Sequence, residues 1–150
     1  MNTRLIRTDA RHKDLQELIN KLNLYLRGKD GEFHEFYPQH NTLKGVIGVV
    51  ILYDGHKAIG CGAFKEFDKN SAEVKRMFVD EKYRGKGVSR LILNEIEQWA
   101  GQEGYNVCML ETGKNMLGAI QFYKKNGYSF IDNYGPYVNA PNSVCMKKEL

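Results

Sequence analysis

Segment 82–90 brings together the residue types from which proteins build a site for phosphate. Its sequence is KYRGKGVSR, in which one residue separates the two glycines. Glycine adopts positive φ readily and lets a ligand approach the backbone, so Gly85 and Gly87 favour a loop with accessible main-chain N–H groups. Four basic side chains surround these glycines: Lys82, Arg84, Lys86 and Arg90. The chemistry that this pattern favours is binding of a phosphate-bearing ligand.

The elements expected on either side strengthen this interpretation. Residues 72–79 are rich in β-branched and aromatic side chains and predict a strand. After the glycines, apolar residues recur at helical spacing: Val88, Leu91, Ile92, Ile96 and Trp99. The first N–H groups of a helix have no internal partner, and the helix dipole favours negative charge there. Strand, glycine loop and helix together predict an anion site at 84–89.

Two phosphate-binding motifs of other folds match the segment less well. A dinucleotide-binding fold requires G-x-G-x-x-G directly after the strand. Here Arg90 stands at the third glycine, and polar residues separate the strand from Gly85. Glu111, at the end of the next expected strand, keeps that alternative open as a counterpart of the ribose-binding acid. A P-loop is excluded, because the chain contains no G-x-x-x-x-G-K-[ST].

Segment 84–89 resembles the acyl-CoA signature of the GNAT N-acetyltransferases, [RQ]-x-x-G-x-[GA], which follows a strand and opens a helix. Arg84, Gly87 and Ser89 take its three specified positions, and Ser89 departs from the usual Gly or Ala by one small side chain. A second stretch, AIQFYKKNGY at 119–128, resembles the family's A-x-x-F-Y-x-K-x-G-[FY] helix. With the strand between them, the resemblance covers residues 46–128.

This resemblance implies an α/β (α+β) fold with a mixed, mostly antiparallel central sheet and helices on both faces. It also implies direct acetyl transfer from the co-substrate acetyl-CoA to a primary amine in a ternary complex, without a metal. A small cationic amine or an amino-acid-like molecule is the favoured acceptor. The alternative is a non-catalytic acyl-CoA-binding or interaction module of the same fold, and a nicotinamide-dependent enzyme is the third choice.

The resemblance also implies where acetyl-CoA binds. Its pyrophosphate would lie on the N–H groups of 84–89, and its pantetheine would run along the edge of strand 72–79 through backbone hydrogen bonds. The N–H group of Phe78 or Val79 would polarise the thioester carbonyl. Many family members carry an asparagine three residues before the helix alanine, where this chain has Met116. The expected cofactor-binding residues are Met77, Phe78, Val79, Arg84, Gly85, Lys86, Gly87, Val88 and Ser89.

Two side chains are candidates for proton transfer. Only about one lysine-like amine in 10³ is neutral at pH 7, so a carboxylate that accepts its proton assists attack on the thioester. Glu73, on the cofactor strand, is the candidate base. The alternative interpretation of Glu73 is an exposed carboxylate that pairs with a lysine of the neighbouring strand. Tyr123, in the F-Y pair, is the candidate donor to the departing CoA thiolate. Its alternative is packing against Phe122 and Tyr128.

Acceptor contacts are expected in two places. Residues 32–44 are polar and aromatic without a clear period, and in the resembled family this segment shapes the acceptor pocket; Glu35 and Tyr37 are the candidates here. Glu111 is the third candidate, because ligands of open α/β sheets bind at the carboxyl ends of strands. His34 and His40 lack the spacing of a zinc site, so no metal is expected.

The remaining pattern supplies the elements that must position these residues. Strands are expected at 4–7, 46–53, 57–67, 72–79, 106–111, 128–131 and 143–148. Helices are expected before 30, from 88 and at 116–125. Turns at 54–55 and 68–70 join three strands as antiparallel hairpins, and the strand–helix–strand order from 72 to 111 predicts one parallel pair.

The composition fits one folded unit. With 150 residues, 42% of them hydrophobic and 27% charged, we expect a single N-acetyltransferase domain over 1–150. The net charge of +4 is too small to indicate a nucleic-acid partner, and no apolar run reaches the ~20 residues that span a membrane. Three cysteines without a C-x-x-C pair, and no secretory signal, predict buried reduced thiols in a cytoplasmic protein. Relatives often pair through a sheet edge, so a homodimer stays open.

Overall fold

The computed structural model describes residues 1–30 and 43–150. Its strands are β1 (Thr3–Thr8), β2 (Val46–Asp54), β3 (Lys57–Asp68), β4 (Ser71–Val79), β5 (Val107–Gly113), β6 (Ser129–Ile131) and β7 (Ser143–Glu149). Its α-helices are α1 (Lys13–Asp30), α3 (Val88–Gln102) and α4 (Leu117–Lys125), with 3₁₀ turns η2 (Glu81–Tyr83) and η3 (Gly135–Tyr137). Each strand expected from the sequence is present, with its ends within two residues of the expected ones.

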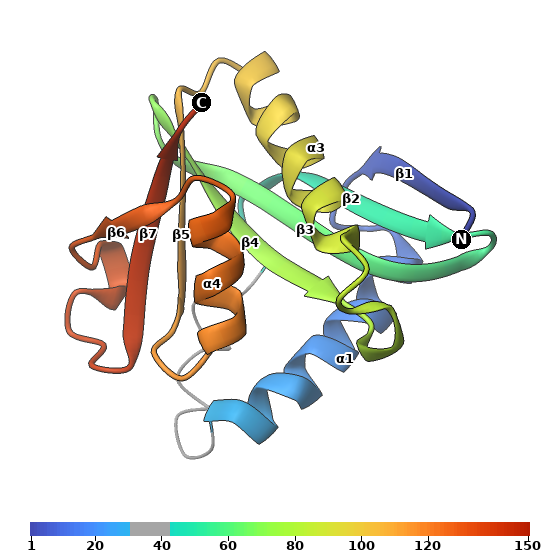
Figure 1. Cartoon of the computed structure of the whole chain (residues 1–150). Helices are drawn as coiled ribbons and strands as arrows, with labels where there is room; N and C mark the ends of the chain where they lie inside the picture. The colour runs from blue at the N-terminus through green and yellow to red at the C-terminus, as the bar shows by residue number, and fades with distance from the viewer. Residues whose placement is uncertain (31–42) are drawn as a thin grey trace.

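Seven strands form one sheet in the order β1-β2-β3-β4-β5-β7-β6 (Figure 1). Of the neighbouring pairs in this sheet, β4 and β5 run parallel and the others run antiparallel. Short turns account for the β2–β3–β4 meander, and α3 is the crossover that lets β5 return parallel to β4. The fold class predicted from the sequence is confirmed.

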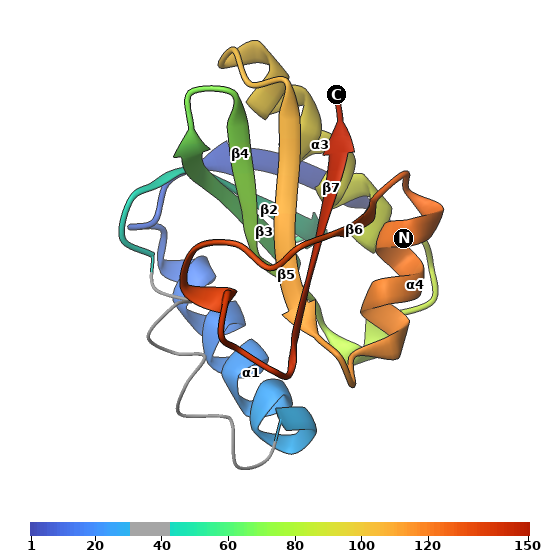
Figure 2. The same cartoon turned by 90° about the vertical axis from the view of Figure 1, so that its left-hand side faces the viewer.

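Helices cover both faces of the sheet (Figures 1 and 2). On one face, α3 and α4 pack over the sheet, with Ile92 and Ile96 of α3 fully buried. On the other face, Leu15, Leu18 and Leu22 of α1 pack against β2 and β3. Because β2 is covered on both sides, it reads as an almost unbroken apolar run in the sequence.

Two glycines of β3 allow α3 to lie close to the sheet. A Cβ on Gly62 would be 2.5 Å from Cδ1 of Ile96, and one on Gly60 would be 2.8 Å from Cδ1 of Ile92. Neither position has room for a side chain, because protein interiors are already close-packed. The contact sets the start of α3 against the end of β4, which is where the glycine loop joins them.

The strands β4 and β5 diverge after a short pairing. Their register joins Ser71–Glu73 to Val107–Met109 and ends there, and Figure 1 shows the rest of the two strands moving apart. Within β4, Arg76 and Met77 together oppose Gly62 of β3. Arg76 has a φ of +56°, so β4 contains a β-bulge at the point where it has left β5.

Two further expectations concern membranes and thiols. In the part of the chain that the structure describes, no helix is long and apolar enough to cross a membrane. Cys61, Cys108 and Cys145 are free and buried, as the sequence predicted. Burial raises the pKa of Cys61 and Cys108 to about 12 and that of Cys145 to about 11.

Candidate active site

A cavity of about 510 Å³ occupies the gap between β4 and β5. Its walls come from these strands, from α1 and α4 on opposite faces of the sheet, and from the loop before α3. Lys86 and Gly87 of that loop, and Val88 at the start of α3, were expected at the site but do not line the cavity. Nine of the residues expected at the site line it: Glu73, Met77, Phe78, Val79, Arg84, Gly85, Ser89, Glu111 and Tyr123.

The glycine loop has the backbone conformation that its sequence favours. Gly85 and Gly87 both have a φ of +77°. Gly87 directly precedes α3, and no side chain caps this helix end. The first N–H groups of α3 therefore keep their donor capacity, and the helix dipole adds positive potential there. Such an end can hold an anion.

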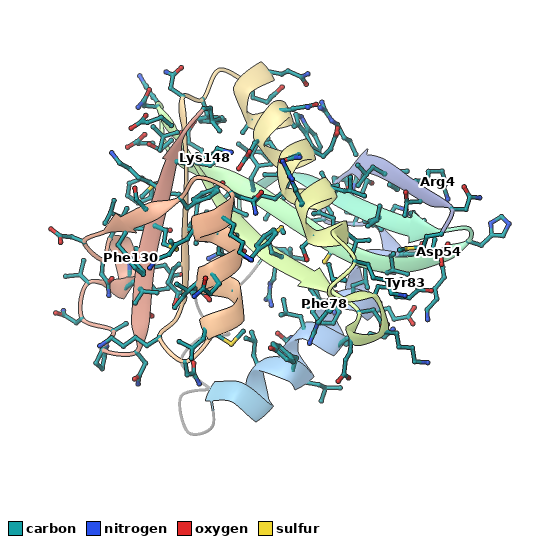
Figure 3. The ribbon with its side chains drawn as sticks, viewed as in Figure 1. Arg4, Asp54, Phe78, Tyr83, Phe130 and Lys148 are labelled. Atoms are coloured by element: carbon teal, nitrogen blue, oxygen red, sulfur yellow. The ribbon has the colours of Figure 1, made fainter. Side chains whose placement is uncertain are left out.

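Neighbouring turns hold this loop in place. Tyr83 O–H donates to Asp54 Oδ2 at 3.1 Å, a contact that can be followed in Figure 3. Asp80 accepts from the Lys82 N–H group at 3.1 Å and pairs with Lys21 Nζ at 3.1 Å. Burial acts to raise the pKa of Asp80, but these donors hold it below its usual value. The carboxylate therefore remains an anchor for the loop at neutral pH.

Arg84 points back along β4 rather than toward the glycines. Its Nε donates to the Val79 carbonyl at 2.9 Å, and its guanidinium lies 4.3 Å from the ring centroid of Tyr25 on α1. Its own N–H group donates to the Glu81 carbonyl at 3.3 Å. The signature arginine is therefore an ordered cation beside the strand, and its N–H group already has a partner.

A buried polar cluster lies where β4 and β5 are still paired. Glu73 is 6% exposed and accepts from Tyr134 O–H at 2.7 Å. Lys75 Nζ lies 3.9 Å from Glu73 Oε2 and donates to the Tyr137 hydroxyl at 3.1 Å. Burial lowers the pKa of Lys75, whereas the charges of Glu73 and Glu111 raise it. The alternative interpretation, an exposed Glu73 paired with a lysine of a neighbouring strand, therefore does not hold. Glu73 is buried, and the cation beside it, Lys75, lies on the same strand.

The connector between β6 and β7 supplies the phenols of this cluster, and Figure 2 shows it crossing β5 toward α1. The rings of Tyr134 and Tyr137 meet edge to face at 5.7 Å. Asn133 Nδ2 donates to the carbonyls of Tyr137 and Ser143, each at 3.0 Å, which ties the connector to itself. Ser143 Oγ donates to Glu111 Oε2 at 2.7 Å. The cluster therefore extends from β4 to β5 through the connector.

The sequence analysis missed four residues here: Lys75, Arg76, Tyr134 and Tyr137. One signal for Lys75 was available, since residues two apart on a strand share a face and Glu73 was already a candidate. For Tyr134 and Tyr137, the one signal in the sequence was the concentration of aromatic residues in the connector. Nothing in the sequence indicated that it would reach β4.

Tyr123 combines both of its sequence-based interpretations. It lines the cavity and is 8% exposed, and its ring meets those of Phe122 and Tyr128 edge to face at 5.2 and 5.6 Å. Burial, and then the charge of Glu111, raises the pKa of Tyr123 above the ordinary value for tyrosine. The phenol therefore keeps its proton at neutral pH and remains a donor. Met116, directly before α4, also lines the cavity.

Two expected acceptor contacts, Glu35 and Tyr37, lie outside the described residues, as do His34 and His40. Among the residues that the structure does describe, no group of three or more His, Cys, Asp and Glu side chains is placed to hold a metal ion.

Known proteins resemble this chain in sequence. The model of the acetyltransferase (GNAT) family matches residues 13–128. An IAA acetyltransferase of Azospirillum brasilense is 32% identical over 149 residues, covering 95% of this chain and 97% of that protein. The uncharacterized N-acetyltransferase YsnE of Bacillus subtilis is 34% identical over 100 residues, covering 65% of this chain and 66% of that protein.

Solved structures share the fold. A Klebsiella pneumoniae protein provisionally assigned as an acyl-CoA N-acyltransferase has a TM-score of 0.83 at 26% identity, covering 99% of this chain and 97% of that one. A GNAT family acetyltransferase of Elizabethkingia anophelis, solved with acetyl-CoA bound, has a TM-score of 0.75 at 20% identity and covers 99% of both chains. The family match and the mostly antiparallel sheet overturn the nicotinamide alternative. The chain belongs to the GNAT acetyltransferase family and is an acetyl-CoA-dependent acyltransferase.

Proposed function

We propose that this protein is a single-domain N-acetyltransferase that transfers the acetyl group of acetyl-CoA to a primary amine by direct attack in a ternary complex. The observation that carries the proposal is the cavity between the diverging strands β4 and β5. It has an uncapped helix end and positive-φ glycines at one end and the buried carboxylate of Glu73 at the other. Two substrates that enter from opposite ends would meet between them.

Acetyl-CoA would occupy the glycine-loop end and the gap beside β4. Its pyrophosphate would accept from the N–H groups of residues 85–89, with Lys86 exposed beside them. Its pantetheine would take the position next to β4 that β5 leaves. Asp80 N–H donates to the Ile59 carbonyl of β3 at 2.8 Å. Because successive N–H groups of a strand alternate in direction, this supports Val79 rather than Phe78 as the donor to the thioester carbonyl.

Glu73 is the proposed general base. The acceptor ammonium would give a proton to this carboxylate, directly or through one water, and the neutral amine would attack the thioester carbon. The carbon–sulfur bond then breaks, and CoA leaves as a thiolate. The nitrogen keeps the acetyl group and loses its second proton to water or to that thiolate. The hydrogen bond from Tyr134 and the charge of Lys75 hold Glu73 in place for this step.

Tyr123 is the proposed donor to the departing sulfur. Its raised pKa keeps the proton on the phenol while the thiolate forms, so it stabilises the negative sulfur first by a hydrogen bond. Glu111, which lines the same cavity, would orient the cationic end of the acceptor. In this proposal, Glu73, Tyr123 and Glu111 all act at one reaction centre inside the cavity.

The experiment compares Glu73→Gln and Tyr123→Phe with wild type, measuring acetylation of a panel of primary amines and the Tm rise caused by acetyl-CoA. Loss of a general base lowers kcat by about 10²- to 10⁴-fold, and we expect the larger loss for Glu73→Gln. The Tm rise should persist in both variants, since a ligand at ~100 times its Kd adds about 2.7 kcal/mol of stability.

Two matched controls lie outside the cavity. Glu149→Gln alters an exposed carboxylate on β7, and Tyr105→Phe removes a phenol that donates to Glu66 at 2.8 Å. Both should leave kcat unchanged. Full activity in Glu73→Gln and Tyr123→Phe would show that the site is wrongly assigned. Binding of acetyl-CoA without acetylation of any amine would instead favour the non-catalytic module.

A further inference from the structure

Arg76 carries a buried hydrogen-bond donor that the protein does not use. Among the side chains that the structure describes, those of residues 1–26 and 43–150, its Nε is the one buried nitrogen or oxygen without a hydrogen-bond partner. Leaving a buried donor unsatisfied is costly, more so when it is charged, and native structures keep few such groups. A ligand that accepts from this guanidinium would remove the cost.

The β-bulge of β4 determines where this guanidinium lies. Arg76 has a φ of +56°, which is rare for a residue with a side chain. Bulges redirect side chains, and this one sends Arg76 toward α1, where Nη1 donates to Asn23 Oδ1 at 3.0 Å. Arg76 also lines the cavity, next in the chain to Lys75 of the polar cluster. Backbone strain of this kind concentrates at binding and catalytic sites.

The charges around Arg76 leave it without a counter-ion in the described part of the chain. Glu73 and Glu111 both act on Lys75, the neighbouring cation. None of the ion pairs among the described residues includes Arg76. Burial lowers the pKa of Arg76, yet a guanidinium stays protonated at neutral pH. Where the structure describes it, the cavity wall contains three cations, Lys75, Arg76 and Arg84, but only two carboxylates, Glu73 and Glu111.

We infer that the acceptor carries a carboxylate, bound by Arg76, while its amine faces Glu73. This inference rests on the proposed function and narrows the acceptor to an amino-acid-like molecule. A guanidinium presents donors in a planar fork that matches the two oxygens of a carboxylate. The carboxylate of such a molecule would then face Arg76, and its ammonium group would face Glu73. A purely cationic amine would leave Arg76 unsatisfied.

The test uses pairs of acceptors that differ only by a carboxylate: phenylalanine and phenethylamine, tyrosine and tyramine, lysine and cadaverine. Acetylation of each is measured with wild type, Arg76→Gln and Asn23→Asp. The second variant keeps Arg76 but gives it a carboxylate partner inside the protein, so it should compete with the acceptor and preserve the fold. Arg11→Gln is the control, because Arg11 is exposed and pairs with Asp9.

We expect wild type to favour the amino acid of each pair in kcat/KM. Arg76→Gln should lower kcat/KM for amino acids by about 10- to 100-fold, the range for loss of a charge-assisted hydrogen bond. It should lower kcat/KM for the matched amines far less. Asn23→Asp should shift the preference in the same direction, and Arg11→Gln should not.

A second measurement uses the product instead of turnover. N-acetyl amino acids should raise the Tm of the wild-type CoA complex, and they should raise it less in Arg76→Gln. Equal use of both members of each pair by wild type, or equal losses for both members in the variant, would overturn the inference while leaving the proposed function intact. A wild-type CoA complex whose Tm is raised by none of the N-acetyl amino acids would overturn the inference too. Absence of any Tm rise with acetyl-CoA would instead contradict the proposed function itself.

Discussion

The two ends of the cavity are built in different ways. At the glycine-loop end, the proposed donors are main-chain N–H groups of one short segment, 85–89, most of which is exposed. At the cluster end, side chains come from β4, β5 and the connector. Glu73 meets Tyr134 from 61 residues away, and Lys75 meets Tyr137 from 62 residues away. One end depends on local backbone conformation, and the other depends on the assembled sheet.

This difference decides what each end tolerates. Exposed N–H groups bind water when no ligand is present, so an empty loop costs little free energy. Buried charges have no such substitute and depend on one another. Changes at the cluster end should therefore affect stability and turnover together, whereas changes at the loop should affect acetyl-CoA affinity alone.

The largest expected effect tests this dependence at Lys75. Lys75→Met removes the cation next to Glu73, and both side chains are less than 10% exposed, at 6% and 8%. Breaking a buried ion pair by removing one partner costs about 3–5 kcal/mol. We expect the free energy of unfolding in urea to fall by that amount.

Lys147→Met is the matched control, because Lys147 pairs with Glu149 at 3.4 Å while both are well exposed, at 45% and 70%. An exposed pair contributes about 0–1 kcal/mol. Equal losses of unfolding free energy in the two variants would mean that the buried pair stabilises the protein no more than an exposed pair does. The contrast between the two ends of the cavity would then disappear.

The next effect concerns the phenol that donates to Glu73. Tyr134→Phe removes a hydrogen bond to a charged group, which costs about 1.5–3 kcal/mol, and kcat should fall while the KM for acetyl-CoA stays constant. Burial and then Glu73 raise the pKa of Tyr134 above its unfolded value. Its stabilisation is therefore complete below about pH 10 and declines as pH rises further. The gap in unfolding free energy between wild type and Tyr134→Phe should narrow above that pH.

Tyr105→Phe provides the comparison for this variant, since Tyr105 also donates to a carboxylate, Glu66, but outside the cavity. It should lose stability without losing kcat. A decrease of kcat in Tyr105→Phe as large as that in Tyr134→Phe would show that turnover follows general stability rather than the cluster.

The loop end and most of the sheet could be predicted from the sequence because their causes are local. The apolar run of β2 and the turns of the meander each lie within a few residues. The positive φ of Gly85 and Gly87 likewise follows from residue type. The motif also marked the start of α3. No long-range contact was needed for any of these.

The cluster end could be predicted only in part because its causes are distant. Glu73 was identified, but its burial results from Tyr134 and the connector. Arg84 was identified, but its direction depends on Tyr25 of α1. Arg76 was not identified, because a bulge in β4 arises from its register with β3 and leaves no mark on the residue types.

A smaller effect is expected at the glycine that precedes α3. Gly87→Ala places a side chain on a residue with a φ of +77°, although a Cβ there would contact nothing. The left-handed conformation costs a non-glycine residue about 1–2 kcal/mol, which corresponds to a rise of roughly 5- to 30-fold in the KM for acetyl-CoA if the loop must keep this shape. The kcat at saturation should not change.

Gly101→Ala is the control for this prediction. Gly101 lies in the last turn of α3, and a Cβ there would also contact nothing. Alanine is the better helix former, so stability should rise by up to about 1 kcal/mol and the KM should stay constant. A KM that does not change in Gly87→Ala would show that the loop conformation is not needed for the cofactor.

The smallest expected effect uses Cys145 as a reporter of the connector. Cys145 is 1% exposed and lies opposite Glu111 on β5 and Ile131 on β6. Burial raises the pKa of Cys145 less than it raises the pKa of Cys61 and Cys108, so the reactive thiolate forms more readily at Cys145. Labelling by a disulfide reagent should be slow at pH 8, occur first at Cys145, and accelerate as pH rises.

Two variants then compare the ends of the cavity. Loosening the connector by Tyr134→Phe should speed the labelling of Cys145, whereas Gly87→Ala at the glycine-loop end should not. Equal acceleration in both variants would show that the two ends open together.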